Sequence, residues 1–150
     1  MPIRKRPTKR QRETISLWAG ACCEYCKTPL AFASVENFEL EHILPVVAGG
    51  LTVLSNLALS CPGCNDNKQI KTQARDPESG ALVSLFHPRQ QLWSDHFAWS
   101  AEGQTIQGRT ATGRATVIAL RLNRSGLVNL RRAQWALGLH PLQVALSAPI

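Results

Sequence analysis

Apolar residues near the start of the chain recur at helical spacing and predict a helix over residues 8–19. Ile15 and Trp18 would share one face of it, and Gly20 stands where a helix commonly ends. The residues before this helix are basic and include two prolines, so we expect them to stay extended until an anion orders them. The chain therefore begins with a predicted basic arm, residues 1–12, that runs into the helix.

The central part of the chain predicts two short strands followed by a helix. Residues 38–43 alternate between apolar and polar side chains, as a half-buried strand does, and the proline and glycines after them break that pattern. Residues 57–59 predict a second strand. From Cys64 onward, polar residues that can satisfy free backbone amides indicate the start of a helix.

The second half of the chain predicts strands and then helices. Residues 76–80 have the composition of a turn, with a proline and a glycine as breakers. Residues 101–104 predict a tight turn within a β-hairpin. We expect strands at residues 81–86, 97–100 and 105–108, and amphipathic helices around residues 113–122 and 127–137.

Length and composition restrict the class of protein. The chain has 150 residues, about one ordinary domain, and 44% of them are hydrophobic. No apolar run approaches the ~20 residues that span a bilayer, so we expect no membrane partner. The basic N-terminus is not followed by the apolar stretch of a secretory signal, which favours a cytoplasmic protein.

The distribution of charge along the chain indicates the kind of binding partner more clearly than the formal net charge of +7 does. Residues 1–12 hold six basic residues, residues 103–150 hold six arginines, and neither segment contains an acid. All ten acids lie between them. An acidic centre between basic ends suits a protein that holds a cation in its middle and a polyanion around it, with Arg4, Lys5 and Arg6 as candidate contacts to nucleic acid. Solvated basic ends without a partner would give the same composition.

Four of the five cysteines are spaced as two metal-binding pairs, Cys23-x-x-Cys26 and Cys61-x-x-Cys64. Two such turns brought together place four thiolates in a tetrahedron, the closed geometry of a structural zinc site. The odd number of cysteines argues against a disulfide framework, and the alternatives are buried free thiols or a redox-active pair. Cys22 is left over, and we expect it to be a small buried apolar residue.

The residues around and between these pairs resemble the HNH endonuclease family, also called ββα-metal or His-Me finger nucleases, in its zinc-bound version. The resemblance covers residues 23–71. It rests on the set of motifs together, and the motifs are Phe38-Glu39-Leu40-Glu41-His42-Ile43-Leu44-Pro45, Gly49-Gly50, Ser55-Asn56-Leu57-Ala58-Leu59-Ser60-Cys61 and Cys64-Asn65-Asp66-Asn67-Lys68.

The resemblance implies that His42 is the general base of a phosphodiester hydrolysis. An imidazole with an unperturbed pKa of about 6.5 suits a base that works near neutrality. Asn56 corresponds to the family's central Asn, and we expect its side-chain oxygen to accept the His42 ring N–H and so fix the tautomer. The alternative for Asn56 is an amide that bridges the loop.

The resemblance also implies a second metal site, formed by Glu41 and Asn65. The family places an acid or a histidine directly before the base, whereas Asn65 replaces the family's final histidine, which makes this chain a His-Asn-Asn variant. Oxygen ligands suit Mg²⁺ or Mn²⁺. Because adjacent strand residues point to opposite faces, Glu41 and His42 need a twist or bulge to share a site, and Glu39 competes with Glu41 as the ligand.

Further candidates for contacts to phosphate lie nearby. Lys68 is one helical turn beyond Asn65 and is expected to reach a phosphate as a point charge, with a solvated lysine as the alternative. Arg89, with His87 and His96 close by, is a second candidate, with capping or packing as the alternative roles.

These observations together predict an α+β protein: a ββα-metal core clamped by a four-cysteine zinc site, residues 20–72, with a C-terminal extension of a β-hairpin and helices, residues 76–150. We expect the whole chain to be one HNH nuclease domain that hydrolyses DNA with the help of a divalent cation. One alternative is a non-catalytic zinc module that binds nucleic acid. Another is a zinc-stabilised scaffold for protein partners.

Overall fold

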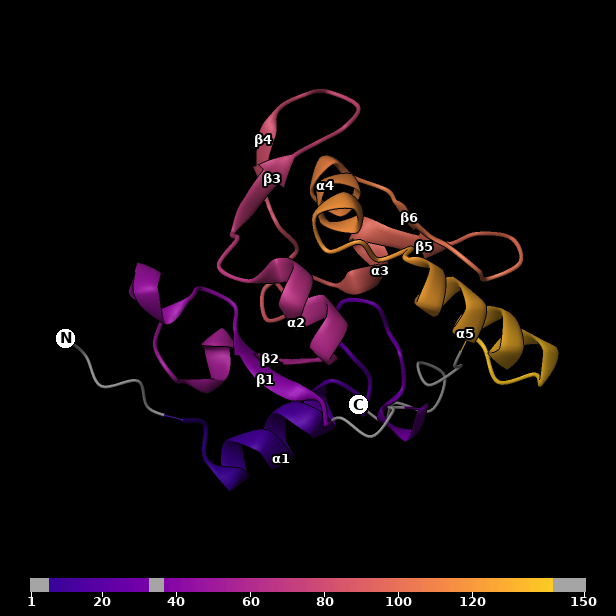
Figure 1. The fold of residues 1–150 in the computed structure, drawn as a ribbon. Coiled ribbons are helices and arrows are strands. Elements are labelled where there is room, and N and C mark those ends of the chain that lie inside the picture. The colour runs from indigo at the N-terminus through magenta and orange to yellow at the C-terminus, as the bar shows by residue number, and fades with distance from the viewer. Residues whose placement is uncertain (1–5, 33–36, 142–150) are drawn as a thin grey trace.

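A computed structural model describes residues 6–32 and 37–141 of the chain (Figure 1). Helices and short antiparallel strand pairs alternate along it, with 3-10 turns at Leu30–Phe32, Val46–Ala48 and Leu54–Asn56. The elements are α1 (Lys9–Trp18), β1 (Glu39–His42), β2 (Leu57–Ser60), α2 (Pro62–Lys68), β3 (Gln73–Arg75), β4 (Leu82–Ser84), α3 (Trp93–His96), β5 (Phe97–Trp99), β6 (Ile106–Gly108), α4 (Ala111–Ala119) and α5 (Ser125–Ala136).

The predicted order strand, strand, helix is confirmed by β1, β2 and α2. Strands β1 and β2 pair antiparallel in continuous register, from Glu39 opposite Ser60 to His42 opposite Leu57. Helix α2 begins at Pro62, two residues before the predicted start, because the side chain of Cys61 caps it and Pro62 suits a first helical position. The α+β class and the ββα core are thus as expected.

Helix α1 begins at Lys9, within the basic arm, and a capping box stabilises its first turn. The Thr8 side chain accepts the backbone N–H of Gln11, and the Gln11 side chain accepts the N–H of Thr8. Ile15 is fully buried where α1 packs against β2, whereas Trp18 on the last turn is half exposed. The helix therefore covers the ββα unit with a narrow apolar face.

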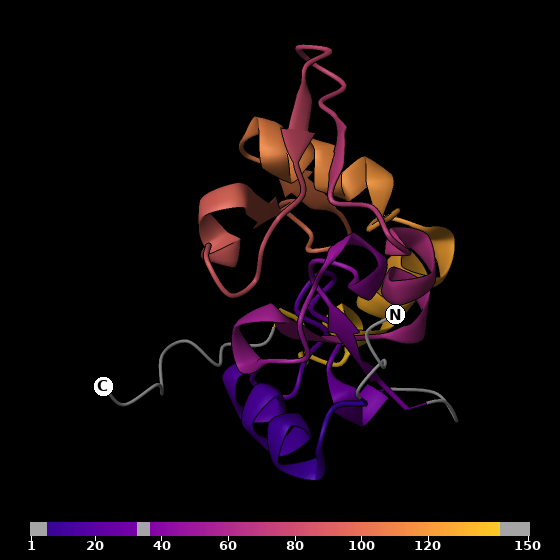
Figure 2. The same cartoon turned by 90° about the vertical axis from the view of Figure 1, so that its left-hand side faces the viewer.

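Two further hairpins follow the ββα unit. The predicted turn at residues 76–80 joins β3 to β4, a hairpin that was not expected, and the turn at residues 101–104 joins β5 to β6 as predicted. Strand β3 and the one-turn helix α3 were not predicted from the sequence. In both views the β3–β4 hairpin and α1 lie at opposite ends of the molecule (Figures 1 and 2).

One cluster of buried side chains joins the ββα unit to the C-terminal elements. It includes the four paired cysteines and Leu57 and Leu59 of β2, together with Phe86, Phe97 and Leu120 from the second half of the chain. Across the described residues, no helix combines the length and the apolar character needed to cross a membrane.

Candidate functional site

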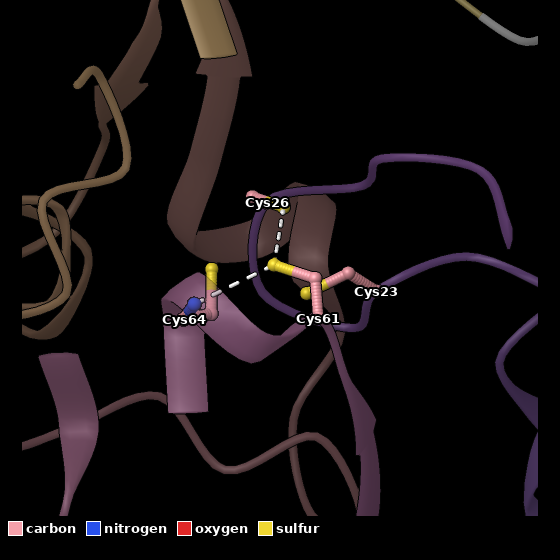
Figure 3. Close-up of side chains that lie close together, drawn as sticks. All are labelled: Cys23, Cys26, Cys61 and Cys64. Atoms are coloured by element: carbon pink, nitrogen blue, oxygen red, sulfur yellow. Dashed lines mark hydrogen bonds between the residues drawn. The ribbon is translucent and has the colours of Figure 1, made fainter. Parts of the chain in front are cut away.

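The four cysteines that were predicted to bind a metal do lie together. Their sulfur atoms are all within 4.8 Å of one another and all four residues are buried, with 3.7 Å between the sulfurs of Cys26 and Cys61. Four thiolates at about 2.3 Å from a zinc ion would stand about 3.8 Å apart, so the cluster fits a tetrahedral ion. Figure 3 shows the pairs converging from the loop after α1 and from the start of α2. Cys22 is buried outside this cluster, as expected.

Backbone pairing brings the two cysteine pairs together. Cys23 donates its N–H to the Thr28 carbonyl, which closes the first turn, and Lys27 adopts a positive φ of 64° within it. Glu24 then donates its N–H to the Leu59 carbonyl, while the Leu59 N–H donates to the Glu24 carboxylate. Because Leu59 lies two residues before Cys61, this contact places the first pair beside the second.

Glu41 of β1 lies in a buried network of polar groups with Tyr25 and with Lys68 of α2. Its carboxylate is 3.1 Å from the Lys68 Nζ and accepts the Tyr25 hydroxyl, and Lys68 also donates to the Ile43 carbonyl at 3.0 Å. Burial raises the pKa of Glu41, while Lys68 and Tyr25 oppose that shift. Burial, with the nearby Glu41, also raises the pKa of Tyr25. Both carboxylate oxygens of Glu41 therefore have protein partners.

The role expected for Lys68 is corrected by this geometry. The residue is 1% exposed, and its ammonium is used by Glu41 and by the Ile43 carbonyl, so it does not face a phosphate outside the protein. A helix lysine is usually solvated, but here β1 presents a carboxylate to the helix, and an ion pair compensates for the burial of both groups.

His42 is positioned by a residue that sequence reasoning missed. Its Nε2 lies 2.8 Å from the Thr52 hydroxyl, and the Thr52 carbonyl accepts the side-chain amide of Gln11 at 3.1 Å. The capping box of α1 thus also anchors the loop that contacts His42. The Thr8-x-x-Gln11 spacing could have predicted the cap, but nothing local in the sequence indicates its contact with Thr52.

Asn56 bridges the β1–β2 loop. Its Oδ1 accepts the Leu44 N–H at 2.8 Å, and its Nδ2 donates to the carbonyls of Leu44 and Leu51. We expect that oxygen also to accept the His42 ring N–H, and this contact stays a prediction. Gly50 permits the tight loop, since a Cβ there would lie 1.7 Å from the Leu44 carbonyl oxygen. The loop-bridging alternative describes what this amide does.

Three of the predicted site residues line one pocket of about 420 Å³: Glu41, His42 and Asn65. Glu39 lines it too, and accepts a hydrogen bond from the Asn65 side chain. The expected bulge is absent, because the register of β1 with β2 is continuous. Strand β1 is paired on one side only, so side chains from both of its faces reach a pocket at its other edge.

Arg89 and the two nearby histidines do not line this pocket. The Arg89 side chain is 10% exposed, pairs with Glu24 and stacks over the Trp18 ring at 5.5 Å. In the structure Arg89 thus has a packing role, and its expected contact with DNA stays a prediction. His87 faces a separate pocket, and its Nδ1 accepts the Arg89 N–H at 3.2 Å. The His96 Nδ1 lies 2.6 Å from the Thr110 hydroxyl.

Three of the six C-terminal arginines are used inside the protein. Arg114 makes two hydrogen bonds to the buried Asp76, Arg124 donates to cysteine sulfurs, and the buried Arg131 donates to the Leu122 carbonyl. The C-terminal basic charge is thus not wholly available to a polyanion.

The N-terminal basic residues that the structure describes lie on the surface. Arg6 is exposed, as are the basic residues of α1: Lys9, Arg10 and Arg12. Arg4 and Lys5 lie outside the described residues. Since Gln11 on the same helix contacts Thr52, this basic surface lies near His42.

Comparison with known proteins identifies the same segment that carries this geometry. A family model described as HNH endonuclease matches residues 23–71, from the first cluster cysteine to three residues beyond α2. No curated protein matches the chain. The matched segment contains both cysteine pairs, β1, β2 and α2, so an HNH endonuclease domain is recognised in residues 23–71, and its four buried cysteines form a cluster that could hold a metal ion.

Proposed function

We propose that the protein is a metal-dependent DNA endonuclease that hydrolyses phosphodiester bonds at the pocket lined by Glu41, His42 and Asn65. In this proposal zinc binds the four cysteines, stabilises the fold and takes no part in the chemistry, because all four positions around it are filled. The observation that supports the proposal most is that a candidate base and oxygen ligands from two elements share one pocket within the HNH domain.

His42 acts as the general base. The His42 imidazole, whose Nε2 lies 2.8 Å from the Thr52 hydroxyl, takes a proton from the attacking water. Thr52 is itself held by Gln11, so the ring orientation is set before substrate binds. Asn56 contributes indirectly, because it shapes the loop between His42 and Thr52.

Glu41 and Asn65 hold the divalent cation. A Mg²⁺ or Mn²⁺ ion there would neutralise charge on the scissile phosphate and on the leaving oxygen. Asn65 contributes its amide oxygen. Glu41 must exchange Lys68 or Tyr25 for the cation, whereas Glu39 already contacts Asn65 in the same pocket and is the alternative carboxylate. Separate neutral variants of the two acids identify the ligand.

The basic N-terminal segment, residues 1–12, binds the phosphates that flank the cleavage site. Arg6, Lys9 and Arg10 are exposed and lie close in sequence to Gln11, which contacts the loop that holds His42. None of them resembles a base-reading motif, so they supply affinity that weakens with salt and little sequence specificity.

Plasmid cleavage tests the proposal. Supercoiled plasmid is incubated with the full chain and Mg²⁺ or Mn²⁺, and nicked and linear products are measured. We expect EDTA and His42→Ala to abolish cleavage, Glu41→Gln or Glu39→Gln to impair it according to which acid binds the cation, and His96→Ala, outside the pocket, to retain it. Cleavage that survives both EDTA and His42→Ala would refute the catalytic assignment.

The ion pair of Glu41 with Lys68 favours a second candidate, a zinc module that binds nucleic acid without cutting it. If both oxygens of Glu41 keep their protein partners, the pocket loses one cation ligand. This candidate predicts binding that weakens with salt, no cleavage with any divalent ion, and unchanged affinity in Glu41→Gln.

A further inference from the structure

Arg124 reaches the cysteine cluster from the C-terminal part of the chain. It precedes α5 as its N-cap residue, 60 positions after Cys64. Its Nη2 lies 3.5 Å from the Cys61 sulfur and 3.7 Å from the Cys64 sulfur, and its Nη1 lies 3.6 Å from the Cys64 sulfur. Among the described residues, no other side-chain nitrogen donates a hydrogen bond to these sulfurs.

The guanidinium group is held in place by the backbone around it. Nη1 also donates to the carbonyls of Leu120 and Arg121, at 3.3 and 3.2 Å, where the chain turns between α4 and α5. Gly63 makes room for it, since a Cβ there would lie 2.6 Å from Nη2. A glycine between Cys61 and Cys64 therefore allows an arginine to approach both sulfurs.

Charge explains why an arginine suits this position. Four thiolates around one divalent ion leave the centre with a formal excess of about two negative charges, and the cluster is buried. A guanidinium beside two of the sulfurs offsets part of that charge, and its N–H groups stabilise the thiolate form. Buried Arg131 is near the cluster, but its N–H groups donate to carbonyls and to the Asn123 side chain, not to sulfur.

We propose that Arg124 is an outer-sphere residue of the metal centre: through N–H···S bonds to Cys61 and Cys64 it slows dissociation of the ion, which makes metal retention depend on the α4–α5 segment. Arg124 lies outside the matched HNH segment, so a residue of the C-terminal extension contacts the cysteine cluster of the domain. The inference rests on the four-cysteine site and does not depend on nuclease activity.

Metal release from the full chain tests this role. Zinc-loaded protein is mixed with excess chelator, and the free zinc is followed with a chromogenic reporter. We expect Arg124→Gln to release zinc about tenfold faster or more than the unmodified protein, as is typical when a ligand loses its outer partner. Arg132→Gln removes an equal charge from the exposed face of α5, away from the sulfurs, and should release zinc at the unmodified rate.

Cobalt substitution provides a second readout that a general loss of stability would not change. The sulfur-to-cobalt charge-transfer band reports directly on the thiolates, so it should shift in Arg124→Gln and not in Arg132→Gln. If Arg124→Gln does not fold, Arg124→Lys, which keeps the charge but loses the planar fork, should fold and release zinc at an increased rate. Unchanged release and an unchanged cobalt spectrum in the variant that folds would overturn the proposal.

Discussion

Replacing Lys68 with Met tests the buried network around Glu41. The substitution keeps the length and apolar stem of the side chain but removes the ammonium that lies 3.1 Å from the Glu41 carboxylate. At that separation the attraction is about 5 kcal/mol with an effective dielectric constant near 20, and most of it offsets the cost of burying the two charges. The intact pair therefore adds little net stability.

Removing one partner changes the free energy of unfolding much more than the intact pair contributes to it. In Lys68→Met the Glu41 carboxylate stays buried with only the Tyr25 hydroxyl, and the Ile43 carbonyl loses its donor. We expect the free energy of unfolding at pH 7 to fall by about 3–5 kcal/mol. The double variant Lys68→Met/Glu41→Gln should recover at least about 1 kcal/mol of this loss, because the unpaired charge is gone.

The pH dependence provides an independent check of the same reasoning. Burial already raises the pKa of Glu41, and removal of Lys68 raises it further. An acid whose pKa is raised by folding stabilises the folded state below its unfolded value, about 4.3, and loses that contribution as the pH rises through the folded value. The deficit of Lys68→Met should therefore shrink as the pH falls from 7 toward 5.

Urea unfolding, followed by tryptophan fluorescence at a fixed zinc concentration, measures these differences. Lys71→Met is the matched control, because Lys71 lies just after α2, is exposed, and its ammonium donates to the Asn67 carbonyl. It should change stability by less than about 0.5 kcal/mol. A loss below about 1 kcal/mol in Lys68→Met, or a deficit that grows on acidification, would refute the ion-pair argument.

Three further predictions concern other parts of the molecule. Cys61→Ser should lose its metal and unfold, because metal binding supplies folding free energy; a variant with normal zinc content and melting temperature would contradict this. Asn56→Ala should destabilise the β1–β2 loop by about 2 kcal/mol and speed hydrogen exchange at the Leu44 amide, and unchanged exchange there would argue against the bridge. Arg114 holds the pKa of Asp76 well below its usual range, so the stability that this carboxylate provides is complete above its unfolded value of about 3.9 and is lost only as the pH falls through the lower folded value. Asp76→Asn should lower the melting temperature equally at pH 7 and pH 5, and a gap that narrows between them would be inconsistent with that shift.

Local patterns predicted the elements of the ββα unit and the set of cysteines. The alternation in residues 38–43 identified β1, and the two Cys-x-x-Cys spacings identified the cluster, because each pattern is written within a few consecutive residues. Helix boundaries shifted by a few residues where caps decide them, as at Cys61 for α2. The pocket shared by Glu41, His42 and Asn65 required the pairing of β1 with β2 and the packing of α2.

The roles of the charged residues could not be predicted in the same way. Lys68, Arg89 and Arg124 all resemble surface cations in the sequence, yet they pair with Glu41, with Glu24 and with cysteine sulfurs. Each partner lies far away along the chain, and the periodicity of apolar residues does not predict such a contact.

The sequence by itself determined the order of elements, the members of the cysteine cluster and the relation to the HNH endonucleases, since these depend on spacing over short stretches of chain. Only the tertiary structure decided which cations remain on the surface for a polyanion, and that His42 contacts Thr52 whereas Asn56 bridges the loop. The physical reason is that a buried charge or amide must find its partner wherever the fold brings one within hydrogen-bond distance, irrespective of separation in the sequence.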